Sequence, residues 1–169
     1  MQSFEFYSPT RVVFGPGREA EVGRLAQEQG ATTVMLVYGG ASALRSGLID
    51  RIEASLAASS IRSFRFGGAK PNPQLAHVRE GIRLALEEKA DLILGIGGGS
   101  SIDTAKAIAL GAANPEQDIW EIWLKRMPLK TVLPIGAVPT IAAAGSEMSD
   151  SAVIDDDAQA LKRGYGSEY

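Results

Sequence analysis

The chain has 169 residues with a formal net charge of −3 at pH 7, and 45% of its residues are hydrophobic, which predicts one globular domain over residues 1–169 rather than a disordered chain. The acidic balance and the lack of a basic run argue against a nucleic-acid partner, and no apolar run approaches the length of a membrane span. Cysteine is absent and the N-terminus lacks the basic and apolar regions of an export signal, so we expect a cytoplasmic protein without disulfides or thiolate metal sites.

Short apolar runs alternate with stretches of helical spacing, and this alternation predicts an α/β fold with a parallel, Rossmann-like sheet and helices on both faces. At the N-terminus, residues 12–14 are expected to form an edge strand or hairpin, and such an edge could pair with a second copy of the chain in a homodimer. The runs expected to form strands are residues 32–38, 61–66, 91–96 and 131–138, and the first and third of them are expected to be buried. Apolar residues at helical spacing follow from Leu48, from Leu75, from Ile102 and over residues 119–124.

The tail after residue 154 differs from the rest of the chain, because it contains a run of aspartates and a short polar stretch. It opens with Asp155, Asp156 and Asp157, and because adjacent carboxylates do not converge on one point, we expect a solvated turn there rather than a cation site. The chain then reaches Tyr169 without a helix stop or a closing strand, which is a hint that it belongs to a longer protein.

A glycine-rich turn is the strongest local motif, because Gly97, Gly98 and Gly99 stand between a buried strand and a helix. Glycines without Cβ atoms let backbone N–H groups approach a pyrophosphate closely, and the helix N-terminus adds unpaired donors and the positive end of its dipole. Ser100 and Ser101 can cap the helix and donate to phosphate oxygens. A tight strand-to-helix turn would also need glycine, but three in succession exceed that need and favour phosphate binding.

The motif is not an ordinary Rossmann fingerprint, because a serine replaces the third glycine and the motif follows a late strand. Residues 97–108, which read Gly-Gly-Gly-Ser-Ser-Ile-Asp-Thr-Ala-Lys-Ala-Ile, resemble instead the signature of the iron-containing (group III) alcohol dehydrogenases. Pro71-Asn72-Pro73 and residues 139–147 resemble two further motifs of that family, and residues 6–17 and 162–164 also fit. The resemblance covers essentially the whole chain and implies the family's dinucleotide-binding domain, without its all-helical metal-binding domain.

The resemblance implies cofactor-binding roles for residues within these motifs, namely Asn72, Gly97, Gly98, Gly99, Ser100, Thr140, Ser146 and Lys162. Asn72 would lie near the adenosine, although an Asn before Pro73 is equally a helix N-cap. Lys162 would lie near the nicotinamide ribose, whereas a lone lysine in a polar tail is usually solvated. Ile141 and Ala144 replace two threonines of the family motif, so two hydroxyl donors of the cofactor groove are missing here.

The end of the second predicted strand bears on the choice of cofactor. NAD-dependent dehydrogenases usually carry an acid there, which accepts from the ribose 2′-hydroxyl and repels a 2′-phosphate. This chain has no acid at that position and offers Gly39, Gly40, Ser42 and Arg45, whose N–H groups, hydroxyl and cation suit a 2′-phosphate. The run also resembles the NADPH-dependent, butanol-dehydrogenase-like branch of the family. The sequence therefore favours NADP over NAD, although a glycine turn with an exposed Arg45 would read the same way.

The family's metal, Fe²⁺ or Zn²⁺, is held by an Asp and three His, and the resemblance places all four beyond the end of this chain. The single histidine, His77, matches no ligand position and is expected to be a surface or groove residue. Asp103, in the first turns of the helix after the glycines, is interpreted as structural capping rather than as a ligand contact. We therefore assign no catalytic and no metal-binding residue to this chain.

The leading hypothesis is the cofactor-binding domain of a metal-dependent NAD(P)H alcohol dehydrogenase or aldehyde reductase, which transfers a hydride between the nicotinamide and a primary alcohol or aldehyde. The 169-residue chain by itself is predicted to be inactive. A second hypothesis is a sibling enzyme such as glycerol dehydrogenase, glycerol-phosphate dehydrogenase or dehydroquinate synthase. A third is a stand-alone nucleotide-binding module without catalysis. The expected partner is a small alcohol or aldehyde, with no nucleic acid and no membrane.

Overall fold

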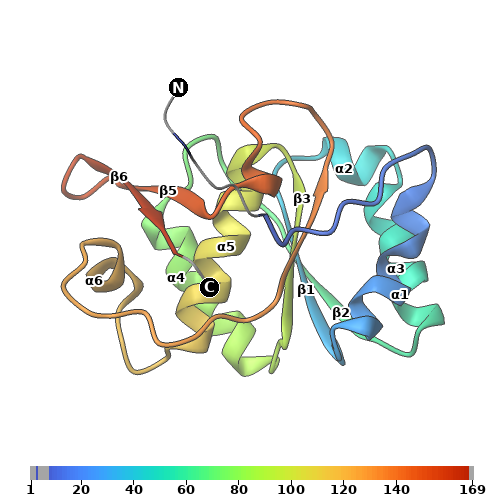
Figure 1. Ribbon diagram of the computed structural model, residues 1–169, viewed down its shortest axis with the longest axis horizontal. Coiled ribbons are helices and arrows are strands. Elements are labelled where there is room, and N and C mark those ends of the chain that lie inside the picture. Colours follow the sequence, from blue (N-terminus) through green and yellow to red (C-terminus); the bar gives the residue numbers. More distant parts are fainter. Residues whose placement is uncertain (1–2, 4–7, 168–169) are drawn as a thin grey trace.

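Four parallel strands form the central sheet of the computed structural model, which describes residue 3 and residues 8–167. The strands are β1 (Thr33–Tyr38), β2 (Arg62–Phe66), β3 (Leu92–Gly97) and β4 (Ile135–Pro139). They lie in the order β2-β1-β3-β4, and each neighbouring pair is parallel (Figure 1). All six residues of the central strand β1 are buried, which explains why its sequence is almost continuously apolar.

Helices cover both faces of this sheet, and the longer ones are α1 (Val22–Glu28), α3 (Leu48–Ala58), α4 (Leu75–Glu87) and α5 (Gly99–Ala113). Val34 and Leu36 of β1 belong to the core that lies beneath α1 and α3. Met35 and Val37 belong to the other core, beneath α4 and α5. Successive side chains of a strand point to opposite faces, so β1 contributes to both cores. The predicted Rossmann-like α/β fold is confirmed.

Shorter helices complete the main body of the fold, namely η1 (Arg18–Glu21), α2 (Ser42–Arg45), α6 (Ile119–Trp123) and η2 (Ser146–Met148). β4 is shorter than the predicted strand 131–138, because the start of that run is bound to the end of α5. The Asn114 side chain donates to the Thr131 carbonyl (2.8 Å) and accepts from the Lys130 N–H (3.2 Å). Only the second half of the run is therefore free to join the sheet.

The segment before η1 does not form the predicted edge strand. Residues 8–14 have no regular secondary structure, and Val12 and Phe14 are 64% and 94% exposed. A strand needs a neighbour for its backbone hydrogen bonds, and in the described part of the chain the sheet ends at β2 and β4. Residues 4–7 lie outside the described residues. The predicted pairing with a second copy therefore has no strand at residues 12–14 to carry it.

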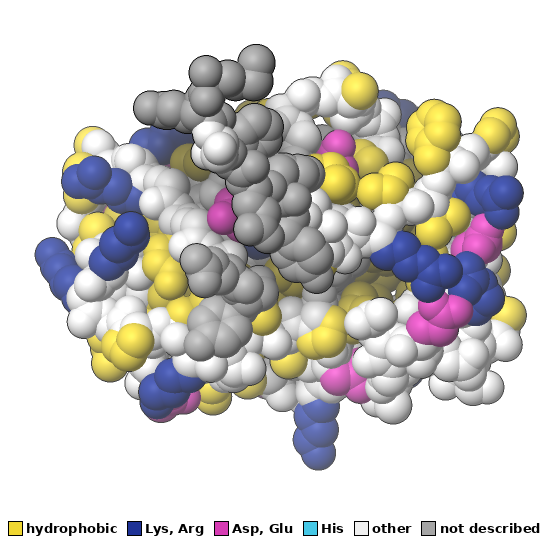
Figure 2. Space-filling model, viewed as in Figure 1, with side chains coloured by type: hydrophobic (Ala, Val, Ile, Leu, Met, Phe, Trp, Pro, Cys, Tyr) yellow, Lys and Arg dark blue, Asp and Glu magenta, His cyan; other side chains and the backbone are white. Residues whose placement is uncertain are grey.

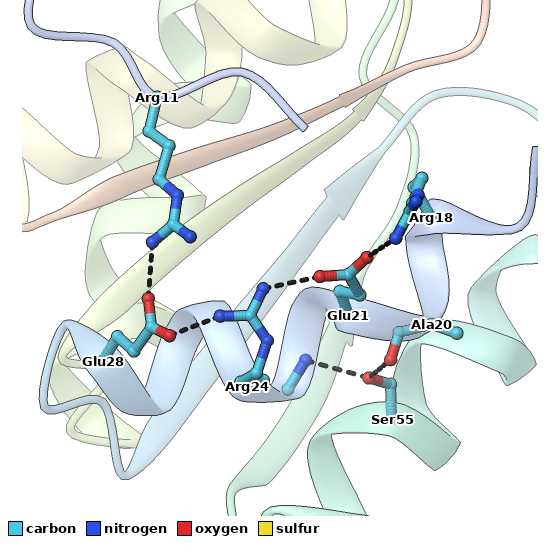
Figure 3. Close-up of polar contacts among 8 residues, drawn as sticks. Arg11, Arg18, Ala20, Glu21, Arg24, Glu28 and Ser55 are labelled. Atoms are coloured by element: carbon cyan, nitrogen blue, oxygen red, sulfur yellow. Dashed lines mark hydrogen bonds and ion pairs between the residues drawn. The ribbon is translucent and has the colours of Figure 1, made fainter. Parts of the chain in front are cut away.

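Side-chain ion pairs hold this segment instead. Five charged side chains alternate in sign along one continuous set of contacts (Figure 3), namely Arg11, Glu28, Arg24, Glu21 and Arg18. Arg11 comes from the segment and the other four from η1 and α1, so the contacts fasten the segment to the first helices. Such exposed pairs each contribute about 0–1 kcal/mol.

Figure 2 shows basic side chains of this face in separate groups at its rim, several beside acidic ones, unlike the one-signed surface that nucleic acid binding favours.

The tail forms an antiparallel hairpin of β5 (Ser151–Asp156) and β6 (Leu161–Gly166), so the prediction that the chain ends without a closing strand is wrong. Every second residue of β5 is buried, namely Ala152, Ile154 and Asp156. An alternation with only two apolar members is too short to predict a strand. Asp157 lies in the turn and is exposed, whereas Asp156 is buried and accepts from the Ala158 N–H (3.0 Å), so a solvated turn describes only part of the aspartate run.

Asp91 fastens the edge of the sheet where β1 and β3 begin. Its carboxylate accepts from the backbone N–H groups of Thr32 (2.9 Å) and Thr33 (2.9 Å) and from the Thr32 hydroxyl (2.5 Å). Burial raises the pKa of this carboxyl, but the donors outweigh burial, and the pKa lies below its ordinary value. The sequence predicts Asp91 as the first residue of the strand, but β3 begins at Leu92. Asp91 precedes the strand, and its side chain links the start of β3 to the start of β1, a contact that we call the clasp.

Replacing Asp91 tests this clasp. Asp91→Ala is expected to lower the free energy of unfolding by about 1–3 kcal/mol at pH 7, because it leaves backbone donors without their acceptor. Since the folded-state pKa is depressed, the stabilisation is present above about pH 4 and is lost as the pH falls through the folded value. Urea unfolding at pH 7 and pH 3 measures both, and an equal difference between wild type and variant at the two pH values would contradict the role of the charge.

Candidate functional site

The carboxyl ends of β1, β3 and β4 meet at one edge of the sheet. The order β2-β1-β3-β4 means that the chain leaves β1 toward one side and β3 toward the other. In open α/β sheets this reversal creates a crevice outside the carboxyl ends of the two central strands, where ligands bind. The segments that line this edge are residues 39–42 after β1, 97–99 after β3 and 140–146 after β4.

Two glycines in the second half of β3, Gly95 and Gly97, are required by the fold itself. A Cβ atom at Gly95 would lie 2.9 Å from the Cα of Ile102, so this glycine lets α5 pack directly on the strand. Gly97 has a φ of +139°, which other residues rarely adopt, and a Cβ atom there would lie 2.8 Å from the Ser101 Oγ. Packing and backbone geometry therefore account fully for these two glycines.

The next two glycines are not required in this way. Gly98 has a φ of −85°, and the nearest atom to a Cβ built there is a methyl carbon of Ile141 at 3.4 Å. A Cβ atom at Gly99 would lie 4.0 Å from that of Ser146, which is ordinary contact. An alanine would fit at Gly99 and, with little adjustment, at Gly98. Within the described residues, neither packing nor backbone geometry therefore requires glycine at these two positions.

Helix α5 starts at this bare turn. Its N-cap is Gly98, which makes no side-chain cap, so the prediction that Ser100 or Ser101 caps the helix is wrong. Ser101 is buried beneath the turn, and the Ser100 carbonyl accepts from the Thr104 hydroxyl (2.7 Å). The first N–H groups of a helix have no partner within the helix, and they carry the positive end of its dipole. The turn therefore presents donors and partial positive charge to the crevice.

The turn after β1 lies beside the glycine turn. A Cβ atom at Gly39 would lie 3.4 Å from the same Ser101 Oγ that lies under Gly97, and its carbonyl accepts from the Gly68 N–H (3.1 Å). Gly40 is exposed, and a Cβ built on it has no atom of the described residues within 4 Å. Ser42 opens α2 and is exposed as well. The structure thus brings the residues predicted to select the cofactor next to those predicted to hold its phosphates.

The loop after β4 forms the other side of the crevice. The Thr140 N–H donates to the Gly97 carbonyl (2.9 Å), which extends the pairing of β4 with β3 by one residue. Ser146 is buried, and its hydroxyl donates to the Asp103 carboxylate (2.5 Å). Both predicted loop residues therefore lie against the glycine turn, although the Ser146 hydroxyl is already bound within the protein.

Asn72 and Lys162, ninety positions apart in the sequence, contact each other. The Lys162 Nζ donates to the Asn72 Oδ1 at 2.7 Å, so Lys162 is not simply solvated. Asn72 has a φ of +59°, and the N-cap of α4 is Gln74, so the alternative interpretation of Asn72 as an N-cap is wrong. The hairpin turn is fastened to the same loop, because the Gln74 side chain donates to Asp157 (2.6 Å).

Sequence reasoning missed the importance of Lys106. This side chain is buried, and its Nζ donates to three backbone carbonyls, those of Ser146 (2.6 Å), Ser149 (2.8 Å) and Ser151 (2.9 Å). Burial lowers the pKa of the Lys106 ammonium, and the nearby carboxylates, that of Asp103 foremost, oppose this shift. A lysine and an acid three positions apart on an otherwise apolar helix were the available signal, since such a pair faces one side.

Asp103, one turn before Lys106, binds the same loop. Its Oδ2 accepts from the Val153 N–H (3.0 Å) while its Oδ1 accepts from the Ser146 hydroxyl. The interpretation of Asp103 as a capping residue is therefore wrong, because its carboxylate binds a distant segment and α5 has no side-chain cap.

His77 lies at the side of the site, in the first turn of α4. Its ring stacks on Phe66, with the centroids 4.4 Å apart, and its Nδ1 lies 3.8 Å from a Glu80 carboxylate oxygen. The Nε2 is buried and has no hydrogen-bond partner within the described residues. Nowhere in residues 8–167 do three or more His, Cys, Asp or Glu side chains come together as a metal site would require. The described residues therefore provide no ligand set for a metal.

Comparison with known proteins identifies the family. Residues 9–169 match the family model described as iron-containing alcohol dehydrogenase. The chain belongs to this family. The probable NADH-dependent butanol dehydrogenase 1 of Bacillus subtilis is 41% identical over 169 residues, which are 99% of this chain and 43% of that protein. The NADPH-dependent aldehyde reductase YqhD of Escherichia coli is 33% identical and is matched by 100% of this chain over 43% of its own length.

Solved structures of the family agree with the fold. The crystal structure of NADH-dependent butanol dehydrogenase A from Thermotoga maritima superposes with a TM-score of 0.95 at 39% identity, over 99% of this chain and 42% of that one. The chain thus spans less than half the length of the curated relatives that it matches. In its described part, none of the helices is both long enough and apolar enough to cross a bilayer.

The environment of His77 predicts a pH dependence of stability. Burial lowers the pKa of the imidazole, the Glu80 carboxylate opposes this, and Lys70 adds to it. Because the folded-state pKa lies below the unfolded value of about 6.5, the unfolded chain binds the proton more readily. Stability is therefore full above about pH 6.5 and falls as the pH drops through that value.

We expect the melting temperature of the wild type to fall more between pH 7.5 and pH 5.5 than that of His77→Phe, which keeps a ring on Phe66 but cannot be protonated. The chain has one histidine, so the difference between the two proteins isolates this group. Parallel pH profiles of the two melting temperatures would contradict the prediction.

Proposed function

We propose that this chain binds the dinucleotide cofactor of a metal-dependent NAD(P)H alcohol dehydrogenase or aldehyde reductase. The observation that carries the proposal is the bare backbone at Gly98 and Gly99, which neither packing nor dihedral angles require. It lies at the uncapped N-terminus of a fifteen-residue helix and at the carboxyl end of a central parallel strand. Unfilled N–H donors beside a helix dipole suit a pyrophosphate, so the residues present fit the cofactor.

In this proposal the chain's own residues hold and orient the cofactor. The glycine turn and Ser100 bind the pyrophosphate, and Thr140 and Ser146 line the crevice on the β4 side. Asn72 and Lys162 approach the cofactor from the hairpin side. The residues proposed to bind the cofactor are thus Gly39, Gly40, Ser42, Asn72, Gly97, Gly98, Gly99, Ser100, Thr140, Ser146 and Lys162.

The bound nicotinamide supplies or accepts the hydride of the reaction. Butanol dehydrogenases and an aldehyde reductase among the relatives support a primary alcohol or aldehyde as the substrate of the whole protein. The family name implies iron, but the described residues do not fit a metal, since no three potential ligands converge. We therefore assign no catalytic step to this chain and expect no turnover by the 169-residue chain alone.

Titration of the purified chain with NADPH and NADH, followed by the fluorescence of the reduced nicotinamide, tests the proposal. Binding of at least one cofactor is expected, and Gly99→Ala is expected to weaken it by about tenfold or more, because the added methyl group narrows the phosphate approach. The same variant should not lower the melting temperature, since Gly99 has room for a Cβ and alanine favours a helix.

Gly95→Ala is the matched control, because its Cβ would collide with the backbone of α5 and should lower the melting temperature. No NADPH oxidation is expected when butyraldehyde and Fe²⁺ are added to the chain. Failure of the wild type to bind either cofactor would overturn the proposal, and aldehyde-dependent oxidation would overturn the assignment of catalysis to residues outside this chain.

We further infer that NADP is preferred over NAD. The turn at residues 39–42 presents exposed backbone, a hydroxyl and no carboxylate, which favours a 2′-phosphate over a ribose hydroxyl that seeks an acceptor. The names of the relatives divide on this point, because the butanol dehydrogenases are called NADH-dependent and the aldehyde reductase NADPH-dependent. The cofactor preference of this chain is therefore worth measuring directly.

Gly40→Asp tests the inference. The wild type is expected to bind NADPH more tightly than NADH, and Gly40→Asp to reverse the order, because the new carboxylate accepts from a 2′-hydroxyl and repels a 2′-phosphate. Gly40 is exposed and has open space, so the fold should tolerate the change. Gln27→Asp on α1, at the opposite end of the sheet, controls for the added charge. A wild type that binds NADH as tightly as NADPH would contradict the inference.

A further inference from the structure

Residues 140–150 form the loop between β4 and β5, and outside the short helix η2 they have no regular secondary structure. η2 is one turn long, and Gly145 before it has a φ of +72°. The loop nevertheless forms one side of the crevice, where Ser146 lies next to Gly99. A loop that lines a binding site must be held in one conformation if it is to contact a ligand in a fixed geometry.

The anchor comes from two charged side chains of α5. The Lys106 Nζ binds the carbonyls of Ser146, Ser149 and Ser151, so one ammonium fixes two points of the loop and the first residue of β5. Asp103 binds the Ser146 hydroxyl in the loop and the Val153 N–H in β5. Asp103 and Lys106 both lie on α5, the helix whose first turn lines the crevice. The same helix therefore carries the glycine turn and holds the loop on the other side of the crevice.

The Lys106 ammonium itself does not belong to the crevice surface. The residue is only 9% exposed, and its three N–H donors are matched by three carbonyl acceptors. It therefore has no donor left for a phosphate. Its charge is kept in the interior by hydrogen bonds to the loop, and a buried charge without such partners would be costly.

We propose that Lys106, together with Asp103, is a positioning residue of the dinucleotide site, which acts on the cofactor only through the loop that carries Ser146. The proposal rests on the proposed function of the chain as a cofactor-binding domain. It assigns to the Asp-x-x-Lys pair of the glycine motif a role distinct from phosphate binding, although the pair lies in the same short sequence as the phosphate-binding turn.

The chain offers a matched control at the other end of the same helix. Asn114 is 1% exposed, and its side chain also makes three hydrogen bonds, to the Leu110 and Thr131 carbonyls and from the Lys130 N–H. It anchors the segment before β4 and lies at the end of α5 away from the glycine turn. Asn114→Leu should therefore cost stability without affecting the crevice.

The experiment compares the dissociation constant for NADPH, at 20 °C, with the melting temperature in Lys106→Met, Asp103→Asn, Lys106→Arg and Asn114→Leu. Lys106→Met and Asp103→Asn are expected to weaken NADPH binding by about tenfold or more, because the loop wall is no longer held. Lys106→Arg, which keeps the charge and the donors, should recover part of the affinity. Asn114→Leu should lower the melting temperature but leave the dissociation constant within about twofold of the wild type.

Wild-type affinity for NADPH in both Lys106→Met and Asp103→Asn would overturn the positioning role. The role would also be overturned if these variants lost no more NADPH affinity than Asn114→Leu does at an equal decrease in melting temperature. If Lys106→Met does not fold, the shape-conserving Asp103→Asn decides by the same criteria. A wild-type chain that binds neither NADPH nor NADH would instead overturn the proposed function and, with it, this role.

Discussion

Helix α5 lies so close to strand β3 that a Cβ atom at Gly95 would come within 2.9 Å of the Ile102 backbone. This contact depends on glycine at positions 95 and 97, and it determines where the first turn of α5 begins. Because β3 is central in the sheet, the helix N-terminus emerges at the crevice between β1 and β3. The turns after β1 and β4 then lie on either side of it. The candidate site is therefore a consequence of one close strand–helix contact.

The same helix also organises what surrounds it. Its early turns carry Asp103 and Lys106, which hold the loop before β5, and its end carries Asn114, which holds the segment before β4. All three are polar residues on a helix that is otherwise almost wholly buried. Buried polar groups are tolerated when their hydrogen bonds are satisfied, and a satisfied network fixes one geometry among many apolar alternatives. The polar residues of α5 thus fix two loops that have few contacts of their own.

Charge has a different role at the surface. The Arg and Glu side chains around η1 and α1 pair in alternation and fasten the N-terminal segment, but each exposed pair contributes little. The buried Lys106 ammonium instead donates to three backbone carbonyls, those of Ser146, Ser149 and Ser151. Exposed ion pairs thus hold a surface segment, whereas the buried charge of Lys106 holds a loop through backbone carbonyls.

Much of the fold and the centre of the site could be predicted from the sequence. Continuous apolar runs identified β1 and β3, because strands buried on both faces have no polar side. The three glycines of the turn favoured phosphate binding in the sequence, and the structure gives a packing or backbone reason for only the first of them, Gly97. The family resemblance, carried by the same motif, is confirmed by the match over residues 9–169.

The remaining features depended on contacts between distant segments. The predicted strand at residues 12–14 found no neighbour, and the unpredicted hairpin at residues 151–166 formed because α5 and α4 cover its buried side. The contact between Asn72 and Lys162 and the three carbonyls at Lys106 join positions that no sequence spacing relates. Local patterns determine strands, helices and tight turns, because those depend on neighbours in the chain. Which glycines the fold itself needs, Gly95 and Gly97 but not Gly98 and Gly99, was decided only by the tertiary packing of α5 against β3.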